Sequence, residues 1–338
     1  MRLKNILQSI AAAGTIGAIA FFWTMPGCRD FRQAAETAGQ QAGHQKPEPP
    51  EQNRPAPQLR TVALPRSSSR IVIGSMNIQT LGVSKIANPD VMSVLTGVAR
   101  QFDCLAIQEI RSKNDQTILR QFVDMINRDG SRYDFFLSPL LGDTSQKFQF
   151  GVVFDTARLQ PTGISFMVPD PQNLLHREPM VTGLRTRTAD PSRAFSFALV
   201  NVHIDPDQTR AELDVLAEVY QWLKASLTSE DDIILLGDFN EPPHRYGNLW
   251  QIPTLRAALP DDVTTNTRGT AAYDNILFDG LLTAEFTGQS GVLDMQQAFG
   301  LTREQALAVS DHLPVWAGFT AGESLSPQYA TQPPPLGR

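Results

Sequence analysis

The chain has 338 residues, of which 41% are hydrophobic and 19% charged, so it can bury a large core. Its formal net charge is −6, and residues 69–322 alone hold 20 basic against 30 acidic residues. That excess of acidic residues excludes binding of nucleic acid by general electrostatic attraction to this part of the chain. A phosphoester substrate would therefore need local basic contacts or bound cations.

The first 28 residues have the pattern of an export signal. Two basic residues precede an apolar run from Ile6 to Met25, which is followed by Pro26 and Cys28. This order is typical of a bacterial secretory signal, and a lipoprotein signal acylated at Cys28 is one form of it. Because Pro26 fits a lipidation site poorly, a cleaved signal and an uncleaved anchor stay open. All three predict an exported protein that is secreted, periplasmic or membrane-tethered.

Two segments of low complexity flank the body of the chain. Residues 29–68 are rich in Pro, Gln, Ala and Glu, and residues 321–338 resemble them in composition. We expect a disordered linker and a disordered tail around one catalytic domain, residues 69–320. If Cys28 is acylated or removed, Cys104 is the one cysteine left, which excludes an intramolecular disulfide.

In the body, short apolar runs alternate with helical periodicities. A strand that begins at residue 71 is expected to run into a polar loop at Asn77. Further strands are expected over 102–110, 133–139, 150–155, 194–206 and 233–237, with apolar runs at 276–278 and 313–319. Helices are expected to begin at 88, 116 and 207. Because helices separate some strands and not others, the pattern predicts a sandwich of mixed sheets flanked by helices.

The most informative stretch covers residues 231–243. Its apolar run, Ile233 to Gly237, indicates a strand buried on both faces, and Asp238 and Asn240 follow at the strand's end. Oxygen ligands in this position suit a hard cation such as Mg²⁺ or Ca²⁺. An ordinary Asx-type turn after a strand explains the same residues equally well.

The same arrangement recurs along the chain. Polar side chains fall at the edge of a predicted strand at Asn77, Glu109, His203, Asp238, Asn240, Asp311 and His312. Each has an ordinary structural explanation, since Glu109 could pair with Arg111 and Asp311 could cap a turn. Together, however, carboxylates, amides and imidazoles are the groups needed for metal-assisted phosphoester hydrolysis.

Five segments, in the order IQEIR, VNVHIDP, LLGDFN, AYDNILF and SDHLPV, resemble the endonuclease/exonuclease/phosphatase superfamily. The resemblance runs from about residue 70 to 319 and is greatest to deoxyribonuclease I-like members. It implies an α/β four-layer sandwich of two mixed β-sheets flanked by helices, with the active site where the loops of the two sheets meet.

The resemblance also implies a role for each matched residue. Glu109 would be the principal ligand of a catalytic Mg²⁺, or of Mn²⁺, with Asn77 and Asp311 beside it, and Ca²⁺ is a further possibility. His312, oriented by Asp274, would be the general base.

On the same grounds His203 would assist the leaving oxygen as an acid. Asp238 and Asn240 would hold the scissile phosphate, a water or a second cation. Arg111 and Arg177 would contact the phosphate backbone, and Tyr273 belongs with these substrate contacts.

The chain departs from the deoxyribonuclease pattern at three positions. An arginine is replaced by Gln79, a tyrosine that packs into the minor groove by Gln146, and a glutamate that supports the first histidine by Phe148. The family's disulfide cysteines are missing too. Loss of an arginine and an aromatic ring weakens the expectation of tight duplex binding. His203 would then depend on Gln149 or another partner, or titrate differently.

These observations predict an exported, divalent-metal-dependent endonuclease that cuts DNA or RNA, with no obligate protein partner. A phosphodiesterase or phosphatase acting on a lipid or inositol phosphoester is the alternative within the same chemistry. A catalytically silent binding module is disfavoured, because every position expected to carry the chemistry holds a competent residue.

Overall fold

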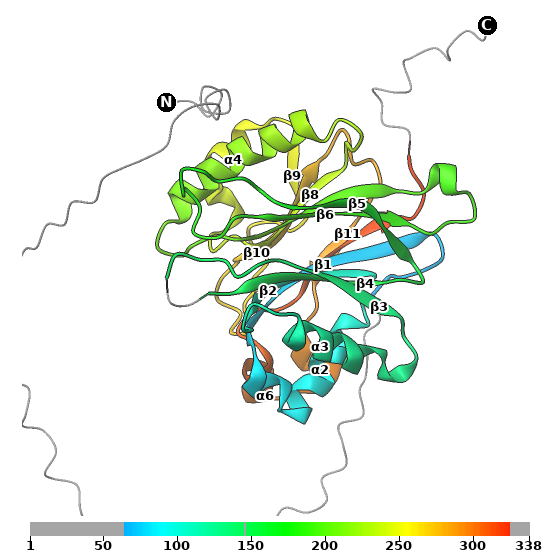
Figure 1. The fold of residues 1–338 in the computed structure, drawn as a ribbon, viewed down its shortest axis with the longest axis vertical. Coiled ribbons are helices and arrows are strands. Elements are labelled where there is room, and N and C mark those ends of the chain that lie inside the picture. Colours follow the sequence, from blue (N-terminus) through cyan, green and yellow to red (C-terminus); the bar gives the residue numbers. More distant parts are fainter. Residues whose placement is uncertain (1–63, 145–146, 325–338) are drawn as a thin grey trace, which may run out of the picture. The chain divides into compact units, whose positions relative to one another are not determined.

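The computed structural model describes residues 64–144 and 147–324 (Figure 1). The predicted signal segment, most of the predicted linker, Gln146, and residues 325–338 of the predicted tail lie outside these ranges. The folded body extends slightly beyond residues 69–320 at both ends. Arg66 forms an ion pair with Asp103 at 2.9 Å, and the backbone amide of Glu323 donates to the carbonyl of Arg193 at 2.7 Å.

Two mixed sheets form the centre of the body. The first has the order β11-β12-β1-β2-β4-β3. Its strands are β1 (Arg70–Leu81), β2 (Cys104–Ile110), β3 (Tyr133–Leu137), β4 (Gln149–Asp155), β11 (Phe286–Val292) and β12 (Val315–Thr320). Only β1 and β2 pair in parallel in this sheet.

The second sheet repeats this arrangement, with the order β5-β6-β7-β8-β10-β9. Its strands are β5 (Leu159–Met167), β6 (Met180–Thr186), β7 (Ser196–His203), β8 (Ile233–Asp238), β9 (Leu255–Ala257) and β10 (Asp274–Asp279). Again one central pair, β7 and β8, runs in parallel.

Helices cover the outer faces of both sheets, as Figure 1 shows. The first sheet is covered by α2 (Pro89–Ala99), α3 (Thr117–Ile126) and α6 (Arg303–Val309), with the short α1 (Val83–Ile86) and α5 (Met295–Phe299), and the second by α4 (Thr209–Ser226). Short 3₁₀ turns lie at Asn127–Asp129, Pro191–Arg193, Pro243–Arg245 and Gly247–Gln251. One hydrophobic core lies between the sheets and one lies under each helical layer. The predicted four-layer sandwich is therefore confirmed.

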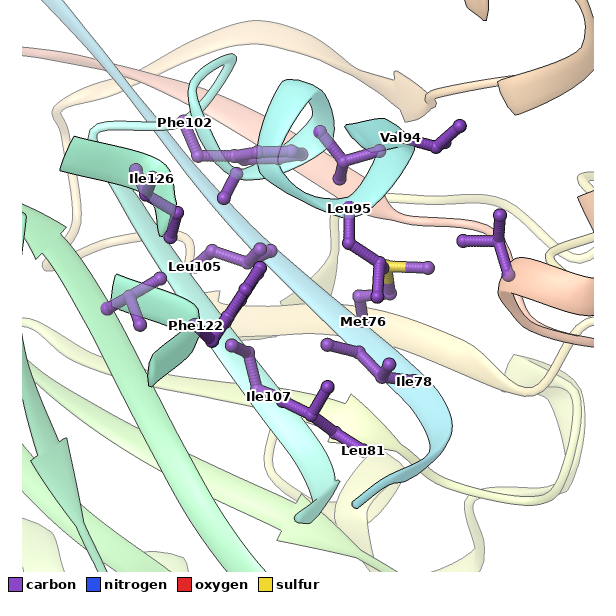
Figure 2. Packing of buried hydrophobic residues seen from close by; sticks show 14 of the residues in the cluster. Met76, Ile78, Leu81, Val94, Leu95, Phe102, Leu105, Ile107, Phe122 and Ile126 are labelled. Atoms are coloured by element: carbon purple, nitrogen blue, oxygen red, sulfur yellow. The ribbon is translucent and has the colours of Figure 1, made fainter. Parts of the chain in front are cut away.

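The core under α2 and α3 shows how sequence periodicity becomes packing. Helix α2 begins at Pro89, where the sequence predicts a helix start. The Asn88 side chain caps it by accepting hydrogen bonds from the backbone amides of Asp90 and Val91. Its buried face packs with Phe122 of α3 onto Met76 and Ile107 of β1 and β2 (Figure 2).

Several elements differ from the prediction. Strand β7 ends at His203 although residues 194–206 were expected to be extended, and α4 begins at Thr209, two residues later than expected. Strand β1 continues to Leu81 although a loop was expected from Asn77, and strands β5, β6, β9 and β11 were not predicted. Strands β5 and β11 are largely solvent-facing or half-buried, and register shifts interrupt both. They therefore lack the apolar run or clean alternation that reveals a strand.

The parallel pairs place the carboxyl ends of four central strands at one edge of the sandwich. The close approach of β7 and β8 there requires a glycine at position 237. The φ of Gly237 is +149°, and a Cβ added to it would lie 2.0 Å from the Val202 carbonyl oxygen. Farther inside, the Gln108 side chain of β2 donates to the Asn201 amide oxygen of β7 at 2.6 Å. This hydrogen bond joins the two sheets behind the edge that holds the polar residues.

Among the described residues, none of the helices combines the length and the apolar character that a membrane crossing requires.

Candidate active site

The side chain of Asn77 connects the two sheets at this edge. Its Nδ2 donates to Glu109 Oε1 at 3.0 Å and to Asp238 Oδ2 at 3.0 Å, while its Oδ1 accepts from the Gln79 amide at 2.9 Å. Glu109 belongs to the first sheet and Asp238 to the second. One buried amide therefore fixes the separation of two carboxylates from different sheets.

Glu109 sits on a distorted part of β2. Its φ is +64°, in the left-handed region that residues with a Cβ rarely occupy, and the pairing of β2 shifts register between Ile107 and Ile110. Gln79, Thr80 and Asn240 also have positive φ and lie at this edge. Strain of this kind concentrates at functional sites. The distortion leaves the Glu109 side chain 19% exposed, with Thr80 Oγ1 donating to its Oε2 at 3.3 Å.

Asp238 is the centre of the cluster. Its Oδ2 lies 3.6 Å from His203 Nε2 and 3.6 Å from His312 Nε2. Burial raises the pKa of Asp238 to about 7, the charge of Asp274 acts in the same direction, and His312 opposes it. Its other oxygen accepts from the Asn240 backbone amide at 2.9 Å, and the Asn240 side chain donates to the Ile204 carbonyl at 2.7 Å.

The His312 ring is oriented by Asp274, which is in turn held by Thr265. Its Nδ1 lies 2.9 Å from Asp274 Oδ2, which also accepts from the Thr265 hydroxyl at 2.8 Å. Burial lowers the pKa of His312, but the Asp274 and Asp238 carboxylates more than compensate and raise it to about 10. The ring of Tyr273 lies beside it, with 5.9 Å between centroids.

His203 has the opposite electrostatic environment. Burial lowers its pKa well below the usual range, and the positive charge of Arg177 acts in the same direction. Its Nδ1 is buried without a hydrogen-bond partner among the described residues. Gln149 is not that partner, since its side chain is engaged by Ser112 at 2.5 Å and by the Ser138 carbonyl at 2.7 Å. The expectation that Gln149 supports His203 is wrong, and the expectation that His203 titrates differently is supported.

Arg177 brings a buried positive charge close to the acidic residues and His203 of the cluster. Burial lowers its pKa, whereas the charges of Asp205, Glu109, Glu212 and Asp238 raise it. Its Nε and Nη1 are buried and, within the described residues, have no hydrogen-bond partner. An anionic ligand would satisfy both nitrogen atoms.

The remaining predicted residues lie farther from this centre. Asp311 is half-buried, and its charge acts on His312. Arg111 is exposed just after β2, and Glu109 is held by Asn77 and Thr80 instead of by Arg111. Phe148, which replaces the expected glutamate, is buried, and Gln79, which replaces the expected arginine, is exposed.

Lys85 is a site residue that the sequence analysis missed. Its ammonium group donates to the carbonyls of Ile78, Gln79 and Val309, at 2.5, 2.8 and 2.8 Å. Burial lowers its pKa to about 8, while Glu109 and Asp311 oppose that shift. Lys85 thereby ties the end of β1 to the end of α6. Thr80 and Thr265 were missed as well, because an isolated lysine or threonine carries no recognisable pattern in the sequence.

The donor atoms at this edge fit a hard divalent cation. Glu109 offers a partly exposed carboxylate, and Asn77 a carbonyl oxygen with a second lone pair. The position of Asp311 beside them stays a prediction. Asp238, Asp274 and His312 also bring ligand atoms within 4.8 Å of one another. In that second group, Asp274 Oδ2 and His312 Nδ1 are hydrogen-bonded to each other at 2.9 Å, whereas the Glu109 side chain is 19% exposed.

Comparison with known proteins finds a matching family model, similar sequences and a shared fold. Residues 74–312 match the model of the "Endonuclease/Exonuclease/phosphatase family". Deoxyribonuclease-1 of Homo sapiens is 29% identical over 272 residues, covering 76% of this chain and 95% of the relative. Deoxyribonuclease-1-like 2 of Mus musculus is 31% identical, covering 73% and 91%. A solved family member from Bacteroides thetaiotaomicron shares the fold, with a TM-score of 0.51, 16% identity and coverage of 76% and 99%.

Proposed function

Because the chain belongs to the endonuclease/exonuclease/phosphatase family, as a deoxyribonuclease I-like hydrolase of phosphodiester bonds, we propose that it is an exported, divalent-metal-dependent endonuclease that cuts DNA. The observation that carries the proposal is the position of two imidazoles, each 3.6 Å from the same oxygen of buried Asp238, beside the carboxylate of Glu109. The deoxyribonuclease relatives support DNA as the substrate class.

In this proposal Glu109 is the principal ligand of Mg²⁺ or Mn²⁺, with Asn77 and Asp311 beside it. A divalent cation bound there would stabilise negative charge on the phosphoryl oxygens as the P–O bond breaks. The amide of Asn77 keeps Glu109 and Asp238 at a fixed separation whether or not substrate is present. Preorganisation of this kind lowers the free energy needed to assemble the transition state.

The two histidines carry the proton transfers. His312, oriented by Asp274, is assigned as the base for the attacking water, and His203 as the acid for the leaving oxygen. The pKa shifts in the structure run against these roles: neighbouring carboxylates raise the pKa of His312, which favours its protonated form, and burial lowers that of His203, which favours its neutral form. The assignment therefore requires both rings to change protonation state when substrate and cation bind.

Substrate contacts come from residues around the cluster. Arg177 would donate to the scissile phosphate through its unpartnered nitrogens, and Asn240, Tyr273 and Arg111 would contact neighbouring groups of the strand. With Gln79 in place of an arginine and an acidic body, binding would depend on these few groups, so its dependence on salt concentration would be shallow.

Export is proposed from the first 28 residues alone, because their basic and apolar segments form a signal pattern. Expression of the full chain in a bacterial host, followed by intact-mass measurement of the recovered protein, tests this. A mature protein that begins near Cys28, with or without an attached lipid, agrees with export. Recovery of uncleaved chain in the cytoplasm alone would refute it.

The enzyme is expected to convert supercoiled plasmid to nicked and linear forms with Mg²⁺, and to lose this activity in EDTA. Glu109→Ala and His312→Ala should each lower the rate by roughly 10³-fold or more, since each removes a group that acts on the reacting phosphate. Gel assays of plasmid nicking measure both effects.

Matched controls are Glu218→Ala and His244→Ala, because both residues are exposed and lie away from the cluster. These variants should keep full activity. Preferential hydrolysis of sphingomyelin or an inositol phosphate over plasmid or RNA would refute the nuclease proposal. Activity that survives EDTA would refute the cation.

The two histidine roles are separated by an oligodeoxynucleotide with sulfur in place of the leaving oxygen. A thiolate leaves without a proton, so His203→Ala should lose at least about tenfold less activity on the sulfur substrate than on the oxygen substrate. His312→Ala should be equally impaired on both. If sulfur instead rescues His312→Ala, the acid and base assignments are reversed.

A further inference from the structure

Glu212 is a buried carboxylate to which the proposed reaction gives no role. It lies in the first turn of α4 and is 1% exposed. Its Oε1 accepts from the backbone amide of His176 at 2.6 Å, and its Oε2 accepts from the backbone amide of Asp205 at 2.8 Å. Both carboxylate oxygens are therefore bonded to segments that lie outside the helix.

The two segments that Glu212 joins both carry residues of the candidate active site. His176 directly precedes Arg177, and Asp205 follows His203 by two residues. The segments belong to different connections of the second sheet, the first from β5 to β6 and the second from β7 to α4. One side chain thus links the backbone beside Arg177 to the backbone beside His203.

Strand pairing fixes the position of His203 but not that of Arg177. His203 pairs with Asp238 across β7 and β8. Arg177 lies in the connection from β5 to β6, and within the described chain its peptide groups form no backbone hydrogen bond. The bond from the neighbouring His176 amide to Glu212 is therefore the nearest anchor of the backbone at Arg177.

The position of the Arg177 guanidinium depends on this anchor. Its Nε and Nη1 are buried and, among the described residues, have no hydrogen-bond partner that would hold them in place. A shift of the peptide before Arg177 would therefore move both nitrogen atoms. In an active site, a displacement of about 1 Å can lower a rate on the order of 10²-fold.

Asp214, two residues farther along α4, makes the same kind of contact with a segment that carries no candidate site residue. Its Oδ1 accepts from the Asn248 backbone amide at 3.0 Å, in the 3₁₀ turn Gly247–Gln251. Its Oδ2 accepts from Arg210 Nε at 3.2 Å. Asp214 therefore provides a matched control for loss of a helix carboxylate that binds a backbone amide.

We propose that Glu212 is a positioning residue of the hydrolase, which holds Arg177 at the distance from His203 that the scissile phosphate requires. The proposal rests on the proposed function, in which Arg177 contacts that phosphate and His203 assists the leaving oxygen. A carboxylate suits this role because both of its oxygens accept hydrogen bonds, and because the first turn of a helix favours negative charge.

Glu212→Gln tests the positioning directly, because glutamine keeps the size of the side chain but turns an NH₂ group toward one of the two amides. In crystals of the full chain, this change should displace the Arg177 Cα by roughly 1 Å or more relative to Asp238, compared with the unmodified protein. Asp214→Asn should leave Arg177 in place. This measurement does not require nuclease activity.

Kinetics with an oligodeoxynucleotide and Mg²⁺ test the consequence. Glu212→Gln should lower kcat/KM by about tenfold or more, whereas Asp214→Asn should keep it within about twofold. Added to Arg177→Ala, Glu212→Gln should lower kcat/KM by less than about threefold, because the group that it positions is already gone. Glu212→Asp, which keeps the charge but is one methylene shorter, should show the same non-additivity and serves if the glutamine variant does not fold.

An Arg177 that keeps its place in the Glu212→Gln crystals would overturn the proposal. Losses that multiply fully when Glu212→Gln is combined with Arg177→Ala would overturn it too, because they would show that Glu212 acts independently of Arg177. If the unmodified chain cleaves no nucleic acid, the proposed function fails, whereas the crystals still decide whether Glu212 positions Arg177. The two proposals therefore fail separately.

Discussion

One amide group holds the candidate active site together. Asn77 donates both of its Nδ2 hydrogens to carboxylates, one on each sheet, and its oxygen fixes the turn that follows. Two carboxylates that repel each other are thereby kept close without a bound cation, because charge-assisted hydrogen bonds to one donor offset part of their repulsion. This amide sets the separation of Glu109 from Asp238, whereas strand pairing within the second sheet sets the positions of His203 and Asp274 relative to Asp238.

The fold makes this bridge possible through its two parallel strand pairs. Because β1 and β2 end at the same edge as β7 and β8, residues far apart in sequence converge there without long loops. The distortion of Glu109 and its neighbours is the conformational cost of that convergence, and the tightly packed layers behind the edge maintain it. Glu212 adds a connection outside the sheets, because its carboxylate joins the segment before Arg177 to the segment after His203.

Much of this arrangement could be predicted from the sequence, for reasons that differ between residues. Apolar runs such as Ile233 to Gly237 reveal buried strands, and a polar residue directly after such a run must lie at the sheet's edge, which is why Glu109, His203 and Asp238 were found. Lys85 was missed because it contacts backbone carbonyls, which no sequence pattern reveals. Thr265 was missed because it acts on His312 only through Asp274. Glu212 was missed because its partners are backbone amides of two other segments. Of the alternatives left open for His203, support by Gln149 was wrong, because the Gln149 side chain is engaged by two serines.

The central claim is that Glu109, Asn77 and Asp311 hold a divalent cation within reach of both histidines. The most direct measurement is anomalous diffraction from crystals soaked in Mn²⁺. The account predicts a manganese peak within coordination distance of a Glu109 carboxylate oxygen, on the side facing His203 and His312. A fully occupied Mn²⁺ elsewhere in an active enzyme, with none beside Glu109, would contradict it.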